Sequence, residues 1–106
     1  MKNLTCTALI QFISNGSEWD RIRIIASDAE MPSETYEGVT RPKTYWPIHP
    51  NYSQACKLVK DMTYLVTFTI TPEKGQPHPK LTLSEIDPVP NKLEQRRYIR
   101  ELKEAQ

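Results

Sequence analysis

Cations and aromatic rings stand close together in two parts of the sequence, where they could pair with phosphates and stack on bases. Arg21 and Arg23 are two residues apart in an extended segment, so their guanidinium groups would share one face and could reach successive phosphates. The second group, which mixes cations with rings, comprises Tyr36, Arg41, Lys43, Tyr45 and Trp46. Such a mixture suits a single strand, because every base offers a π-face to a ring. Lys74, His78 and Lys80 lie in or beside a proline-rich loop and could clamp a strand from the other side.

These groups also have structural interpretations. Arginines that alternate with isoleucines are typical of any solvated strand face. Tyr45 and Trp46 are adjacent, so in a strand they point to opposite faces, and we expect only one of them to be free for stacking. Three arginines near the C-terminus are balanced by Glu94, Glu101 and Glu104, which predicts a solvated helix there.

Catalytic and metal-binding groups find little support in the sequence. His49 and His78 stand alone, with no cysteine or carboxylate at metal-ligand spacing. The chain has only three glycines, too few for a phosphate-binding loop. Cys6 and Cys56 fall on apolar faces and are expected to be inert thiols. We therefore expect no enzyme, no cofactor and no metal site.

Composition limits the class further. The 106 residues suit a single domain, and 14 Lys and Arg against 13 Asp and Glu leave a net charge of +1. A nucleic-acid binder usually has a basic excess, so a basic groove here requires charge segregation, with acidic residues 28–37 kept outside it. The sequence has no apolar run of membrane-spanning length and no signal-peptide pattern, and its two cysteines suit a reducing compartment. We expect a cytoplasmic protein that does not enter membranes.

Period-2 alternation predicts four strands, at residues 4–13, 19–26, 62–70 and 80–86. Asn15 and Gly16 predict a hairpin between the first two, where Ile22, Ile24 and Ala26 would share one face. An irregular third strand falls within residues 35–39 or 43–46, and a short helix is expected at residues 51–59. Helix-forming residues without Gly or Pro predict a terminal helix at 92–104.

This succession resembles the OB-fold of small single-stranded-DNA-binding proteins, most closely over residues 58–70 and 79–89. The resemblance implies a mainly β protein, with a five-stranded Greek-key barrel at residues 1–90 and the short helix between strands three and four. The terminal helix then forms a helical tail at 91–106. It implies a groove for single-stranded DNA or RNA across strands two and three, with little sequence preference. The phosphate contacts would be Arg21, Arg23, Arg41, Lys43, Lys74 and Lys80, and the stacking rings Tyr45 or Trp46 and Tyr36. It further suggests self-association, or a replication or recombination protein as partner.

A second hypothesis keeps the fold but replaces the nucleic acid by a protein. In that case the chain is an accessory or inhibitory module, and its surface is either the acidic segment 28–37 or the apolar stripe of the terminal helix. Leu93, Tyr98, Ile99 and Leu102 form this stripe, which could equally serve self-association.

Overall fold

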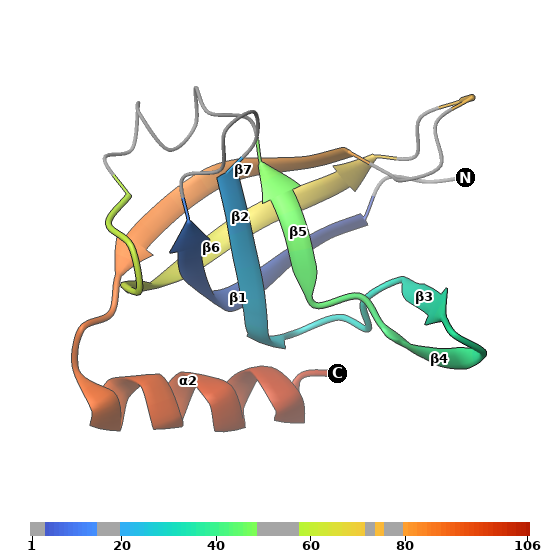
Figure 1. Ribbon diagram of the computed structural model, residues 1–106. Coiled ribbons are helices and arrows are strands. Elements are labelled where there is room, and N and C mark those ends of the chain that lie inside the picture. Colours follow the sequence, from blue (N-terminus) through green and yellow to red (C-terminus); the bar gives the residue numbers. More distant parts are fainter. Residues whose placement is uncertain (1–3, 15–19, 49–57, 72–73, 76–79) are drawn as a thin grey trace.

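The computed structural model describes residues 4–14, 20–48, 58–71, 74–75 and 80–106, which form mainly β structure (Figure 1). One antiparallel sheet contains β1 (Leu4–Ser14), β2 (Asp20–Ser27), β5 (Tyr45–Ile48), β6 (Thr63–Thr71) and β7 (Lys80–Pro88). A separate hairpin of β3 (Ser33–Tyr36) and β4 (Val39–Pro42) interrupts the path from β2 to β5, and α2 (Lys92–Glu104) follows β7.

The strand order in the sheet is β5-β2-β1-β6-β7. Because β6 returns to pair with β1 on the side away from β2, the strands β6, β1, β2 and β5 follow a Greek-key order. The sheet curls until β5 approaches β7, which makes a half-barrel with these two strands at its edges (Figure 1). The barrel-like, mainly β architecture expected from the alternation is therefore present.

The concave face of the half-barrel holds the main core, because alternate residues of each strand point inward. On β1 and β6 these are the residues that the alternation predicts, among them Phe12, Val66 and Phe68, each nearly or fully buried. Trp46 and Ile48 of β5 complete the core from the opposite edge. Although β5 has only four residues, these two buried side chains attach it to the barrel.

A β-bulge in β2 changes which face Ala26 occupies. Leu9 pairs with Ala26 while Ile10 pairs with Ile24, so Ile25 is an extra residue in the ladder. The expectation that Ala26 shares a face with Ile22 and Ile24 is therefore wrong. Ala26 instead lies with Leu9 in a second, smaller apolar cluster on the outer face.

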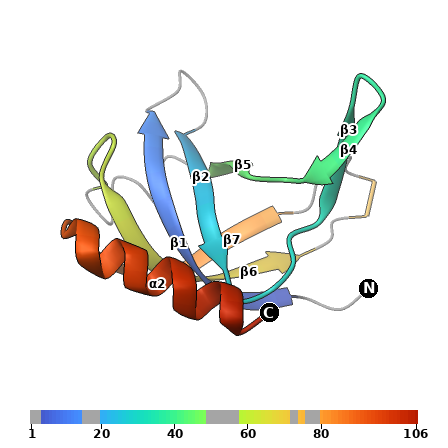
Figure 2. The same cartoon turned by 90° about the horizontal axis from the view of Figure 1, so that it is seen from below.

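Helix α2 covers this second cluster. Its residues Tyr98, Ile99 and Leu102 pack with Leu9 and Ala26 of the sheet, so α2 lies against β1 and β2 (Figure 2). Asn91 caps the helix by accepting hydrogen bonds from the N–H groups of the second and third helical residues. At the other end Gln106 Nε2 donates to the carbonyl of Ser27 at 2.9 Å, which fixes the C-terminus to β2. The helix is part of the same packed unit as the barrel.

Other expectations are met only in part. The third strand is split, since residues 33–42 form the separate hairpin and only Tyr45–Ile48 joins the sheet. The helix predicted at 51–59 falls mostly outside the described residues, and its two described members, Leu58 and Val59, are not helical. The Asn15-Gly16 turn also lies outside them. Within the described residues, none of the helices combines the length and apolar character needed to cross a membrane.

Candidate nucleic-acid interface

Three neighbouring strands bring five residues together on the outer face of the half-barrel. Arg23 of β2 lies opposite Gln11 of β1 on one side and Tyr45 of β5 on the other, and Arg21 lies opposite Pro47. We call Gln11, Arg21, Arg23, Tyr45 and Pro47 the outer patch. Directly opposed residues of an antiparallel pair have Cβ atoms about 5 Å apart, so the Tyr45 ring and the Arg23 side chain are neighbours.

Gln11 orients the guanidinium group of Arg23. Arg23 Nη2 donates to Gln11 Oε1 at 3.0 Å, while Gln11 Nε2 donates to the carbonyl of Asp61 at 3.3 Å. This bond uses one of the five N–H donors of the arginine. Sequence reasoning missed Gln11, although a lone polar residue within the apolar run at residues 8–13 was a signal.

The adjacent rings of Tyr45 and Trp46 have opposite environments. The side chain of Tyr45 is 54% exposed, whereas that of Trp46 is 1% exposed and belongs to the core. The indole Nε1 donates to the carbonyl of Lys43 at 3.0 Å, so the only polar atom of the ring is satisfied internally. This corrects the expectation for Trp46, because a buried ring has no face to offer a base. Tyr45 is the ring of this pair that is free to stack.

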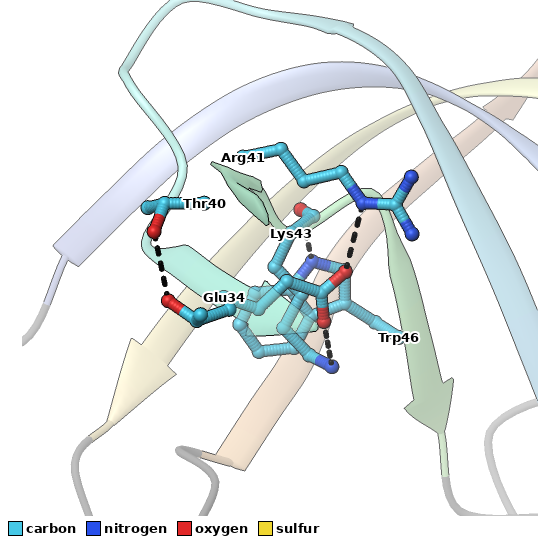
Figure 3. A network of polar contacts seen from close by, with 6 residues as sticks. Glu34, Thr40, Arg41, Lys43 and Trp46 are labelled. Carbon is cyan, nitrogen blue, oxygen red and sulfur yellow. Dashed lines mark hydrogen bonds and ion pairs between the residues drawn. The ribbon is translucent and has the colours of Figure 1, made fainter. Parts of the chain in front are cut away.

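Lys43 is committed to internal contacts (Figure 3). Its ammonium group lies 3.5 Å from a Glu34 carboxylate oxygen and 5.1 Å from the centroid of the Trp46 ring, and its side chain is only 14% exposed. A cation held by a carboxylate and a ring face is a poor phosphate ligand. The structure therefore gives Lys43 a structural role. The Nε atom of Arg41 lies 3.9 Å from the same carboxylate, but the Arg41 side chain is 65% exposed, far more than that of Lys43.

The β3–β4 hairpin, which we call the arm, projects from the half-barrel (Figures 1 and 2). Tyr36 and Val39 face each other across its tip and are 66% and 60% exposed. The two residues between them, Glu37 and Gly38, have φ angles of 51° and 79°. Of the sequence-predicted residues, Tyr36 and Arg41 thus lie on the arm and not in the outer patch.

The expected clamp between β6 and β7 is described only in part. Lys74 is exposed in the turn that joins these strands, at the opposite edge of the sheet from β5. Lys80 begins β7 opposite Thr71, and its side chain and His78 lie outside the described parts. Lys74 does not join the outer patch.

The second hypothesis assigns a protein partner to the acidic segment 28–37 or to the apolar stripe of α2, and both surfaces already make contacts within the chain. In the acidic segment, Asp28 accepts a hydrogen bond from the backbone N–H of Thr7 at 2.9 Å, and Glu34 forms ion pairs with Arg41 and Lys43. The helix stripe packs on the sheet, except for Leu93, which is 73% exposed.

Cys6 is a free thiol buried in the main core. Burial, and secondarily the charge of Asp28, raises its pKa to about 12, so it stays protonated at neutral pH. Across the parts of the chain that the structure describes, three or more His, Cys, Asp or Glu side chains do not gather into a possible metal site.

Comparison of the chain with known protein families, with curated proteins and with solved structures finds no significant match.

Proposed function

We propose that the protein binds single-stranded nucleic acid, DNA in the first instance, with little sequence preference along the outer patch. The observation that carries this proposal is the cross-strand pair of the half-buried Arg23 and the exposed Tyr45, with the exposed Arg21 beside it. The two guanidinium groups pair with phosphates, and the Tyr45 ring stacks on a base. Backbone contact and stacking tolerate any sequence, because neither reads the edges of the bases.

The fold supports the same interpretation. The sheet order and the gap between β5 and β7 agree with an OB-fold, a partly open five-stranded Greek-key barrel. In that fold the nucleic acid crosses the second and third barrel strands, which correspond here to β2 and β5. The outer patch occupies those strands. Arg41 and Tyr36 on the arm, and Lys74 in the β6–β7 turn, would make further contacts with a longer strand.

The stacking role is tested by replacing Tyr45 with alanine and titrating a fluorescently labelled dT oligonucleotide, followed by anisotropy. We expect Tyr45→Ala to weaken binding by about 1–3 kcal/mol, the usual contribution of one stacked base. Tyr45→Phe keeps the ring and removes only the hydroxyl, so it should bind almost as well as the native protein.

Equal affinity of the native protein and Tyr45→Ala would remove Tyr45 from the site. Absence of dT binding by the native protein at low salt, where phosphate contacts are strongest, would contradict the proposed function altogether. Because Tyr45 is exposed, its replacement should leave the folding equilibrium nearly unchanged, and a denaturation curve provides that control.

The alternative is a protein-interaction module of the same fold. The observation in its favour is the arm tip, where Tyr36 and Val39 expose apolar area on a projecting element. A salt-insensitive complex with a protein that is lost in Tyr36→Ala, together with no binding of dT, would support this alternative over the first.

A further inference from the structure

The exposed surface of α2 separates most of its charges by sign. Lys92, Arg96, Arg100 and Lys103 are spaced by four, four and three residues, so at 3.6 residues per turn they lie along one flank. All four are exposed. We call these four residues the basic ridge.

The acidic residues occupy the other flank. Glu94, Glu101 and Glu104 lie there with Arg97, whose Nε is 3.7 Å from a Glu101 carboxylate oxygen. Within the described residues no ion pair involves a member of the basic ridge. The near-zero net charge of the chain therefore conceals a local row of four cations that form no ion pair with the described part of the chain.

This arrangement is unfavourable for the helix by itself. Lys92 and Arg96, and then Arg96 and Arg100, are like charges at i,i+4 spacing, which destabilises a helix. Lys92 also lies in the first turn, where the helix dipole favours an anion. An external row of negative charges would relieve both effects. The ridge thus has the properties of a surface that binds a polyanion.

Helix α2 lies on the same face of the sheet as the outer patch. Ile25 and Ala26, which pack in the cluster beneath α2, are the second and third residues after Arg23 on β2. The packing of Tyr98, Ile99 and Leu102 on the sheet fixes the helix in this place, so its cations are held in a defined row.

We infer that the basic ridge is a second phosphate-binding surface, and that one single strand passes from the outer patch onto α2. This inference rests on the proposed function and extends it, since it gives the strand a path and lengthens the site. A membrane surface fits the helix less well, because an interfacial helix needs a free apolar face and that of α2 is buried against the sheet.

The test compares Arg96→Gln with Arg97→Gln, and then uses the double variant Arg96→Gln/Arg100→Gln. Arg96 and Arg97 are neighbours of one residue type on opposite flanks, so the two single variants lose the same charge from the same helix. Glutamine is nearly as good a helix former as arginine, and circular dichroism checks that α2 persists. Binding of dT oligonucleotides of about 5 and about 16 nucleotides, which span the usual range of OB-fold site sizes, is measured against salt concentration.

The double variant loses two phosphate contacts with the longer oligonucleotide, and each contact contributes about 0.7 to the slope of log K against log salt. We therefore expect this slope to become less steep by about 1.4 in the double variant. Its affinity for the shorter oligonucleotide, which the outer patch alone can hold, should change little. Arg97→Gln should resemble the native protein at both lengths.

Two other results would overturn the inference and differ from each other. If the native protein binds dT but the double variant keeps the full salt dependence at both lengths, the ridge is not part of the site and the proposed function stands. If the native protein does not bind dT, the proposed function fails and this inference fails with it. Binding to vesicles of anionic lipid that is lost in the double variant would not rescue either of them.

Discussion

Arg23 is partly ordered before any ligand arrives, because Gln11 accepts one of its hydrogen bonds and is itself held by the carbonyl of Asp61. An arginine side chain that is already restrained loses less conformational entropy when it binds a phosphate. Arg21 is exposed and has no such restraint among its described contacts. The two arginines of the outer patch thus combine one oriented and one adaptable cation.

At the residue scale we predict that Arg21→Gln/Arg23→Gln makes dT binding less dependent on salt. Each lost phosphate contact should reduce the slope of log K against log salt by about 0.7, so about 1.4 for the pair. Arg97→Gln serves as a control, because it also removes an arginine, but one that lies beside Glu101 on α2 and has no part in the proposed site. A slope that is equal in the native protein and the outer-patch variant would show that these arginines do not touch phosphates.

The arm is the element whose conformation depends most on single residues. At its base Lys43 binds Glu34 and covers the Trp46 ring (Figure 3). The backbone N–H of Lys43 also donates to the carbonyl of Pro32. At its tip Glu37 and Gly38 both have positive φ, as a type I′ turn requires. Glutamate is strained there, because its Cβ disfavours the left-handed region.

At the element scale we therefore predict that Glu37→Asn stabilises the arm by up to about 1 kcal/mol. Gly38→Ala should have the opposite effect; a Cβ at Gly38 would meet open space, so the loss would come from backbone strain alone. Amide hydrogen exchange within residues 33–42 measures both changes, because local opening of the arm need not involve the barrel. Faster exchange in Glu37→Asn would contradict the prediction.

The whole molecule depends on two apolar clusters, one on each face of the sheet. The main core fills the concave face, and α2 closes the smaller cluster on the outer face through Leu102, which is 7% exposed. A chain of this length has a thin core, so the second cluster is a substantial part of its stability.

At this scale we predict that Leu102→Ala lowers the free energy of unfolding by about 2–3 kcal/mol, as for a buried leucine. Leu93→Ala on the same helix should change it by less than about 0.5 kcal/mol, because Leu93 is exposed. Chemical denaturation measures both. If Leu102→Ala unfolded at the native midpoint, residues 91–106 would be a tail that does not contribute to the stability of the barrel.

Local pattern predicted much of this structure. Alternation identified β1, β2, β6 and β7 and most of their inward residues, and it showed that Tyr45 and Trp46 could not both face solvent. These features depend on neighbours in the chain, and side chains alternate along any strand. The pairing of Arg21 with Arg23 on one face follows from the same rule.

Only the tertiary structure decided which cations are free. Lys43 and Arg41 look alike in the sequence, but contacts with Glu34 and Trp46 bury the first and leave the second exposed. The bulge at Ile25, which turns Ala26 toward α2, follows from pairing with β1 and not from the β2 sequence itself. The apolar stripe of α2 could have met a partner or its own sheet, and the folded chain places it on the sheet. The bulge and the place of α2 depend on residues distant in the chain, and the burial of Lys43 depends on the hairpin that brings Glu34 back beside it. Periodicity within one segment specifies none of these contacts.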